Sequence, residues 1–457
     1  MKKLLSVVLA LALALSMCAT ALADYQVNEE VAAKTATLTI FGPGVWAVGE
    51  QDSTDLISGV TKPGYHVVKE RWAELYPNIT LDIQETGWDS WQTAITTACL
   101  SGDVDIIAHG ATMVDLTEDL APYCEAEPEY MAQINATASR ITTDNPSVYK
   151  ISGISISLSP MVIWCDSEIF EHYGVDLPTG DWTFADVLEI AKKLTGTDPV
   201  TGQETYGIQL DAMGQNNLWF NYVLCANSLG ATVYEYGETL KDCKVNYLSD
   251  ESIRAFEMIA EFAPYCSPEA KEGLAVDESL SGNNNWAMLI REGPIGAYQE
   301  MVANNLVGRY KAITLPICTA GRYEGKPTPH AGDNNIAIYK DSDKKDIAWE
   351  FIKFMTTDPA MIKWIADNGS LPNSKDSEQA ISSLVTEEYV APLMFCLNNI
   401  PEYYNNATNY VMNNVSFGAT TANLITAVSN VLQGFSTPQE AAQLMQDGVD
   451  EYLAGLK

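Results

Sequence analysis

Three strand-like apolar runs alternate with two helix-like segments near the start of the chain, and no other feature constrains the fold as strongly. The runs at residues 36–41, 79–84 and 105–108 are rich in β-branched side chains or alternate apolar with polar residues, which predicts strands. The segments 65–75 and 90–100 between them have helical periodicity. This β-α-β-α-β order predicts a parallel sheet covered by helices, and therefore an α/β fold.

The loops that follow these strands are the first place to expect a site. Ligands of open parallel sheets bind just beyond the carboxyl ends of the strands. In this chain those ends are residues 42–46, 85–88 and 109–112.

A second block of elements begins at residue 151. Strands are predicted at 154–158 and 161–164, on either side of Pro160. A helix follows, and Thr183 with Asp186 forms its S/T-x-x-D cap. Further helices are predicted at residues 218–229, 252–262, 347–356, 359–367, 389–397, 424–432 and 438–453.

The first 23 residues have the three parts of a secretory signal peptide. Two lysines precede an apolar run at residues 4–17, and the small residues Ala21 and Ala23 fit cleavage after Ala23. The run is shorter than the roughly 20 residues that a transmembrane helix needs. Lipid attachment at Cys18 is the alternative. In both cases we expect a secreted protein that acts outside the cytoplasm, at the cell surface or in the periplasm.

The length of the chain indicates how many lobes to expect, and its charge excludes some classes of partner. A chain of 457 residues exceeds the roughly 250–300 residues at which a single core stops growing, so we expect two or three lobes. Lys and Arg number 26 against 60 Asp and Glu, which gives a formal net charge of −34. This charge repels phosphate backbones and anionic membranes, and disfavours nucleic acid as a partner.

Residues that carry catalysis or bind metals do not form a local pattern. The His residues are far apart, no P-loop or dinucleotide fingerprint occurs, and residues 153–157 lack the final Gly of a nucleophile elbow. With 60 acidic residues, carboxylate pairs at glycosidase spacing arise by chance. We therefore expect no metal, no cofactor and no catalytic residue.

Eight Cys follow the signal peptide, and the sequence leaves their state open. An even number in an exported chain permits disulfides. A chain of this length needs no covalent staples, so buried free thiols are the other interpretation.

Aromatic residues outside helical stripes indicate a ligand more than any other feature. Rings stack on the apolar faces of sugars, while Asn, Gln and Asp bind the hydroxyls. Rings in loops or at helix starts are Trp46, Trp88, Trp91, Trp219, Tyr403 and Tyr404, and core packing is the alternative role for each. Trp72, Trp182, Trp349 and Trp364 are at apolar helical positions and are predicted to lie in the core.

A series of short motifs runs along nearly the whole mature chain. They are residues 72–77, 101–107, 115–120, 162–170, 286–294, 310–316, 332–336, 348–352 and 434–441. In this order and spacing they resemble the extracellular solute-binding proteins of ABC importers, a family that includes maltose-binding protein.

This resemblance implies a two-lobed, periplasmic-binding-protein-like (type II) fold, with α/β lobes joined by hinge crossovers. Lobe 1 would comprise residues 36–150 and 320–371, and lobe 2 residues 151–319 and 372–457. A solute would be enclosed between the lobes when the hinge closes. The implied partners are a small-molecule solute and the membrane subunits of an ABC permease, and we expect a monomer.

Positions that match the family's binding loops are candidate ligand contacts. In the first lobe they are Gly42, Pro43, Trp46, Glu85, Trp88, His109, Thr112, Asp333 and Asn334, and in the second Trp219, Tyr403 and Tyr404. Ile295 replaces a stacking Trp of the family, so a sugar platform is lost there. Tyr298 is a substitute ring, and Arg291 is a cation that would favour a solute with some negative charge.

Capture of a sugar or oligosaccharide, without chemical change, is the favoured function. A secreted glycoside hydrolase is the enzyme alternative, and it needs two opposed carboxyl groups, one with a raised pKa. A further alternative keeps the fold but changes the solute to an acidic sugar, a peptide or a polyamine.

Overall fold

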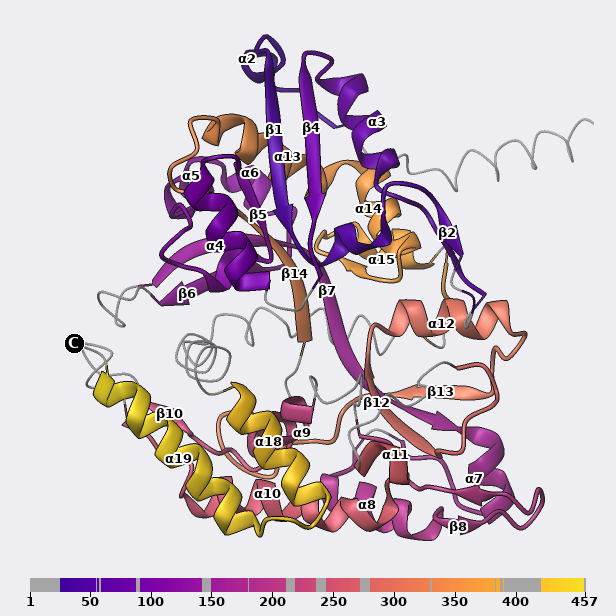
Figure 1. Ribbon diagram of the computed structural model, residues 1–457. Coiled ribbons are helices and arrows are strands. Elements are labelled where there is room, and N and C mark those ends of the chain that lie inside the picture. Colours follow the sequence, from indigo (N-terminus) through magenta and orange to yellow (C-terminus); the bar gives the residue numbers. More distant parts are fainter. Residues whose placement is uncertain are drawn as a thin grey trace, which may run out of the picture.

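The structure is a computed structural model and describes the following residues of the chain (Figure 1): 25–54, 56, 59–87, 91–141, 149–179, 181–210, 218–235, 244–271, 280–328, 331–382, 384–386, 389 and 421–455. The predicted signal peptide lies outside these residues. So do Trp88, Tyr403 and Tyr404, and nearly all of the helix predicted at 389–397.

The predicted β-α-β-α-β unit is confirmed. Strand β1 (Ala36–Gly42) pairs in parallel with β4 (Ile79–Glu85) on one side and with β5 (Ile106–Ala108) on the other. Helices α3 (His66–Leu75) and α4 (Trp91–Ser101) connect the strands. The carboxyl ends of the three strands therefore lie at one edge of the sheet.

One long strand connects the upper and lower parts of the molecule in Figure 1. The first part of β7 (Tyr149–Asp166) pairs antiparallel with β6 (Thr137–Ile141) and β14 (Ala331–Ile338). Its last part pairs antiparallel with β12 (Met288–Glu292) and β13 (Tyr310–Ile313).

Two predictions for this region are wrong. Pro160 does not separate two strands but lies inside β7, where the pairing partner changes from Ala331 of β14 to Glu292 of β12 at the next residue. Because proline has no N–H to donate, it fits a point where one ladder ends and another begins. The sheet is mixed rather than parallel, because β14 runs antiparallel to both β5 and β7.

Helices pack around the sheet in both the upper and the lower part of the molecule in Figure 1. The helices of the upper part include α13 (Lys345–Thr357) and α14 (Pro359–Asp367), and those of the lower part are α7 (Ser167–Tyr173), α8 (Phe184–Lys193), α9 (Leu218–Ser228), α10 (Asp250–Phe262), α12 (Pro294–Ala303), α18 (Thr421–Leu432) and α19 (Pro438–Gly455). The predicted cap of α8 is confirmed as a reciprocal pair, because the side chains of Thr183 and Asp186 each accept from the other's backbone N–H.

The remaining elements are short. They are α2 (Glu29–Ala32), η1 (Val45–Val48), β2 (Ser53–Thr54), β3 (Thr61–Lys62), η2 (Gly110–Thr112), α5 (Ala121–Ala126), α6 (Pro128–Met131), β8 (Gly196–Thr197), β9 (Glu204–Thr205), β10 (Tyr234–Glu235), β11 (Lys244–Val245), η5 (Ala263–Tyr265), α11 (Pro268–Lys271), β15 (Leu371–Pro372) and α15 (Ser377–Ser382).

Two large apolar cores make the molecule two-lobed. The core of the first lobe lies around β1, β4, α13 and α14 and contains Trp72, Trp349 and Trp364. The core of the second lobe lies around α8, α9, α10, α18 and α19 and contains Trp182. These four Trp are at most 5% exposed, so their predicted place in the core is confirmed. A smaller core lies against β7, β12 and α12.

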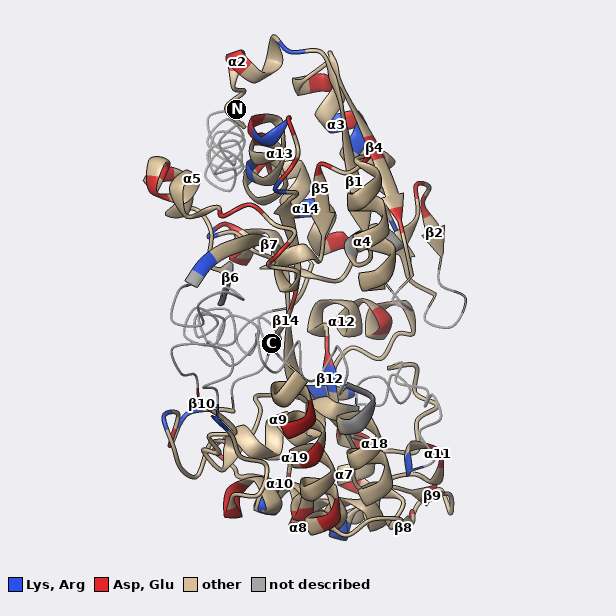
Figure 2. Ribbon diagram, turned by 60° about the vertical axis from the view of Figure 1, so that its left-hand side comes forward, with Lys and Arg blue, Asp and Glu red and all other residues tan. Residues whose placement is uncertain are grey.

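The described cysteines are free thiols. Cys99, Cys124, Cys165, Cys225, Cys266 and Cys318 are buried and unpaired, so for these six the thiol interpretation holds, while Cys243 and Cys396 lie outside the described residues. Acidic residues are spread over elements of both lobes (Figure 2). Within the described parts of the chain, we find no helix with the length and hydropathy of a membrane span.

Candidate functional site

The candidate site is the edge of the first lobe's sheet where β1, β4 and β5 end. The strand ends are in register, since Gly42 lies opposite Glu85 and Phe41 opposite Ile107. Because β14 runs antiparallel to β5, its first residues lie at this same edge. Segments from four distant parts of the sequence therefore meet here, and the order of elements predicts three of them, the ends of β1, β4 and β5.

The loop after β1 approaches its neighbours so closely that it requires glycine. A Cβ atom on Gly42, which has a φ of 140°, would lie 2.5 Å from the carbonyl oxygen of Ala108. A Cβ on Gly44, with a φ of 103°, would lie 2.8 Å from Oδ1 of Asn334. The two glycines let this loop, with the buried Pro43 between them, lie against β5 and β14.

A row of polar side chains connects β14 to β7 beside this loop. The hydroxyl of Ser155 donates to Oδ2 of Asp333 over 2.7 Å, and Nδ2 of Asn335 donates to the same oxygen over 3.2 Å. Nδ2 of Asn334 donates to the hydroxyl of Ser157 over 3.1 Å. Oδ1 of Asp333 has no hydrogen-bond partner among the described residues, and can accept a further hydrogen bond.

The loop after β5 completes this edge. His109 adopts a left-handed backbone conformation (φ 57°), its N–H donates to the carbonyl of Asn335 over 2.6 Å, and its ring packs edge-on against Trp91 at 5.3 Å. The hydroxyl oxygen of Thr112 is buried and has no hydrogen-bond partner in the part of the chain that the structure describes. The carboxylate of Glu85 is exposed at the end of β4.

Sequence reasoning missed three residues at this edge: Ser155, Ser157 and Glu292. A Cβ on Gly332 would lie 2.8 Å from Oε1 of Glu292, so this carboxylate of β12 lies against the backbone of β14. Alternation of Ile with Ser along β7 is the signal that could have placed both serines on one face of a strand.

The structure places Trp46 in the core of the first lobe. Its side chain is fully buried, and its ring packs against Trp364 at 5.9 Å and Phe351 at 6.3 Å. The interpretation of Trp46 as a ring open to a ligand is therefore wrong for this structure, because its apolar neighbours take up its faces. Trp46 has the alternative role, packing in the core.

The second-lobe candidates are also engaged by protein groups. Trp219 is 8% exposed and stacks on Phe220 at 3.9 Å, and Tyr298 is 5% exposed and packs against Tyr389 at 5.1 Å. The expectation that Arg291 contributes a cation is corrected, because both its terminal nitrogens pair with the carboxylate of Glu300 at 2.7 Å. This pair neutralises the charge that would have favoured an anionic solute.

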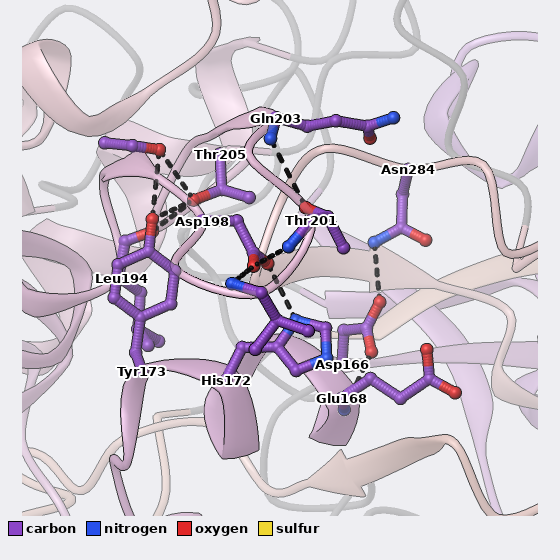
Figure 3. A network of polar contacts seen from close by, with 12 residues as sticks. Asp166, Glu168, His172, Tyr173, Leu194, Asp198, Thr201, Gln203, Thr205 and Asn284 are labelled. Carbon is purple, nitrogen blue, oxygen red and sulfur yellow. Dashed lines mark hydrogen bonds and ion pairs between the residues drawn. The ribbon is translucent and has the colours of Figure 1, made fainter.

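A second polar cluster, in the second lobe, is internally satisfied (Figure 3). Asp198 accepts from the N–H groups of Val200 and Thr201 over 2.8 Å, and its other oxygen lies 2.8 Å from Nδ1 of His172. Burial by itself raises the pKa of Asp198, but the hydrogen bonds from Thr201, His172 and Val200 outweigh it and lower the pKa to about 2. This cluster closes a turn.

A neighbouring set in Figure 3 fixes the start of α7. Asp166 caps this helix by accepting from the N–H of Glu168, and it also pairs with Arg309 and with Nδ2 of Asn284. Because its carboxylate is saturated by protein donors, we assign it a structural role. Among the described residues, no group of three or more His, Cys, Asp or Glu is arranged to hold a metal ion.

Comparisons with known proteins agree with this architecture. A sequence model of the family described as bacterial extracellular solute-binding protein matches residues 59–362. No curated protein matches the chain in sequence.

Solved structures are similar over most of the chain. The ABC substrate-binding protein Lmo0181 of Listeria monocytogenes, in complex with cycloalternan, has a TM-score of 0.65 and 19% identity, covering 92% of this chain and 100% of that one. An ABC transporter solute-binding protein of Agrobacterium radiobacter K84, in complex with ribitol, has a TM-score of 0.68 and 17% identity over 91% and 98%. Maltose-bound MalE3 of T. maritima has a TM-score of 0.62 and 16% identity over 92% and 100%. At these identities the likeness shows the fold.

Proposed function

Because the chain belongs to the family of bacterial extracellular solute-binding proteins, we propose that it is the solute-capturing component of an ABC importer and that its solute is a carbohydrate. Family members are binding proteins that act outside the cytoplasm. Structures with the same fold are described in complex with cycloalternan, ribitol, α-D-tagatose, D-mannitol and maltose. Neutral polyhydroxylated solutes are therefore the first class to test.

The observation that carries this proposal is the polar edge of the first lobe. Oδ1 of Asp333 and the carboxylate of Glu85 are acceptors for solute hydroxyls, and the hydroxyl of Thr112 both donates and accepts. The ring of His109, half-buried beside Trp91, adds an apolar surface with polar nitrogens at the same edge. We propose these residues, with Gly42, Pro43 and Asn334, as the first-lobe contacts.

The mechanism that follows is enclosure rather than reaction. A solute that forms hydrogen bonds with this edge and with groups of the second lobe links the lobes, so its binding favours a closed arrangement. The backbone of Gly42 and Gly44 holds the loop in place beforehand, which lowers the ordering cost of binding. Release requires opening, and the solute leaves chemically unchanged to the permease.

We propose lobe 1 as residues 36–150 and 320–371, and lobe 2 as residues 151–319 and 372–457. Trp88, Tyr403 and Tyr404 remain proposed stacking rings. We also propose a monomer that is exported with cleavage after Ala23, while a lipid anchor at Cys18 is the alternative that mass spectrometry of the mature protein distinguishes.

Calorimetric titration of the purified protein tests the proposal. We expect saturable binding of at least one compound from a panel of monosaccharides, oligosaccharides and sugar alcohols. We also expect that compound to be recovered chemically unchanged. Asp333→Ala should weaken binding by roughly 10-fold or more, because an acceptor to the solute is lost. Asp343→Ala, an exposed control on the turn after β14, should bind like the wild type. Sugar recovered as hydrolysed products would instead establish a glycoside hydrolase.

A further inference from the structure

One buried amide of the second lobe has no partner for either of its polar atoms. Asn221, on α9, is 2% exposed, and both Nδ2 and Oδ1 lack a hydrogen-bond partner in the described part of the chain. More than about 90% of buried polar groups in folded proteins are paired. Asn221 therefore calls for an explanation.

The helix itself offers no partner to this amide. Residues three and four positions further along, Leu224 and Cys225, share the face of Asn221 and are buried and apolar. One turn beyond them, the hydroxyl of Ser228 donates to the carbonyl of Cys225. A partner must therefore come from outside α9.

Two other buried amides, Asn373 and Asn335, have partners for both of their polar atoms. Asn373 accepts from the N–H groups of Asn135 and Ala136 and donates to the carbonyls of Ala136 and Ser155. Asn335 accepts from Ala111 and donates to Asp333. Asn368 has partners for Nδ2 but none for Oδ1, so among the buried amides of the described residues Asn221 alone lacks a partner on both atoms.

The position of α9 relates this amide to the proposed site. Both views place α9 toward the side of the second lobe that faces the first lobe, although α12 and β12 lie nearer to it (Figures 1 and 2). Trp219, a candidate ligand contact, belongs to the same helix, two residues before Asn221 and on a different face. A solute held between the lobes would thus approach α9.

We infer that Asn221 is a ligand-binding residue that recognises hydroxyl groups of a neutral solute, an inference that rests on the proposed function. An amide offers one acceptor and two donor hydrogens, and hydroxyl groups match both because each can donate and accept. A carboxylate can only accept, and an ammonium group can only donate. Either would leave half of the amide unpaired and would bring a charge into a buried place. The amide therefore selects against acidic and cationic solutes.

The inference predicts opposite effects on stability and binding. In the free protein an unpaired buried amide is unfavourable, so Asn221→Leu, a change of similar size, should raise the melting temperature by about 2 °C. The same variant should bind the sugar that the wild type binds roughly 10- to 100-fold more weakly than the wild type does, because two hydrogen bonds to the sugar are lost. A residue that only packs would not show this combination.

The test is scanning calorimetry and titration of the full mature chain with ribitol, D-mannitol, α-D-tagatose, maltose and a wider set of neutral, acidic and amino sugars. Asn373→Leu is the stability control and should lower the melting temperature, because it leaves backbone groups unpaired. Asn78→Leu, at an exposed turn of the first lobe, should change neither property.

The possible results distinguish the role of Asn221 from the proposed function. A fall in the melting temperature of Asn221→Leu would show that the amide already has a partner, such as a buried water, and would overturn the inference. Unchanged sugar binding by this variant would also overturn it, while leaving the proposed function intact. If the wild type binds no sugar of the panel, the proposed function fails, and the role of Asn221 fails with it.

Discussion

At the scale of single residues, close backbone approach explains why the loop after β1 has the sequence Gly-Pro-Gly. The positive φ of Gly42 and its contact with Ala108 together exclude a side chain. We expect Gly42→Ala to lower the free energy of unfolding by about 3 kcal/mol, from backbone strain plus the clash.

Gly49→Ala is the matched control for this substitution. Gly49 also has a positive φ, of 81°, but nothing lies within 4 Å of a Cβ built there. Gly49→Ala should therefore cost only the backbone strain, about 1–3 kcal/mol, and less than Gly42→Ala. Denaturant unfolding measures both variants. If both lost the same free energy of unfolding, Ala108 would have moved to make room for the new side chain, and its contact would not constrain the loop.

A residue-scale pH dependence follows from Asp198. Its folded-state pKa of about 2 lies below the ordinary value of 3.8, so its contribution to stability is complete above about pH 4 and is lost as the pH falls toward 2. The melting temperature of the wild type should exceed that of Asp198→Asn clearly at pH 5 and by much less at pH 2.5. If the difference in melting temperature between the two proteins were the same at both pH values, the lowered pKa of Asp198 would be wrong.

At the scale of elements, one carboxylate joins two helices of the first lobe. Asp358 is fully buried, its Oδ1 caps α14 by accepting from the N–H groups of Ala360 and Met361, and its Oδ2 accepts from Arg71 of α3. We expect Asp358→Ala to lower the free energy of unfolding by about 3 kcal/mol, because it removes the cap and leaves Arg71 unpaired at this position.

Asp358→Asn separates these two contributions. The amide oxygen can still cap α14, but the charge that pairs with Arg71 is gone, so a loss of roughly 1–2 kcal/mol is expected. Thermal unfolding monitored by circular dichroism measures both variants. If the Asn variant were as unstable as the Ala variant, the cap would contribute nothing.

Elements were predictable from the sequence where their signals are local. The strands at 36–41 and 79–84, the helix at 359–367 and the cap of α8 depend on periodicity and capping residues, which lie within a few positions of each other. The antiparallel direction of β14 and the continuity of β7 through Pro160 depend on pairing between distant segments. No local pattern encodes that pairing.

The same distinction explains the candidate site. Loops after strands could be placed because parallel topology brings their carboxyl ends together, and Gly42, His109 and Asn334 do lie at one edge. Whether a ring faces solvent depends on tertiary packing, so Trp46 could not be recognised as a core residue. The pairing of Arg291 with Glu300 was hidden for the same reason.

At the scale of the whole molecule, two separate cores and the strand that joins them make relative motion of the lobes the expected response to a solute. A solute that bridges the first-lobe edge and α9 would stabilise a closed form only to the extent that it binds that form better. The proposed function therefore depends on a change of shape that a single-core protein would not show.

Small-angle X-ray scattering with and without a saturating carbohydrate, followed by analysis of the recovered sugar, tests this claim most directly. We predict a smaller radius of gyration with the bound sugar, and a sugar recovered intact. An unchanged radius at saturation, or a sugar recovered in cleaved form, would contradict the view of this protein as a hinged carrier.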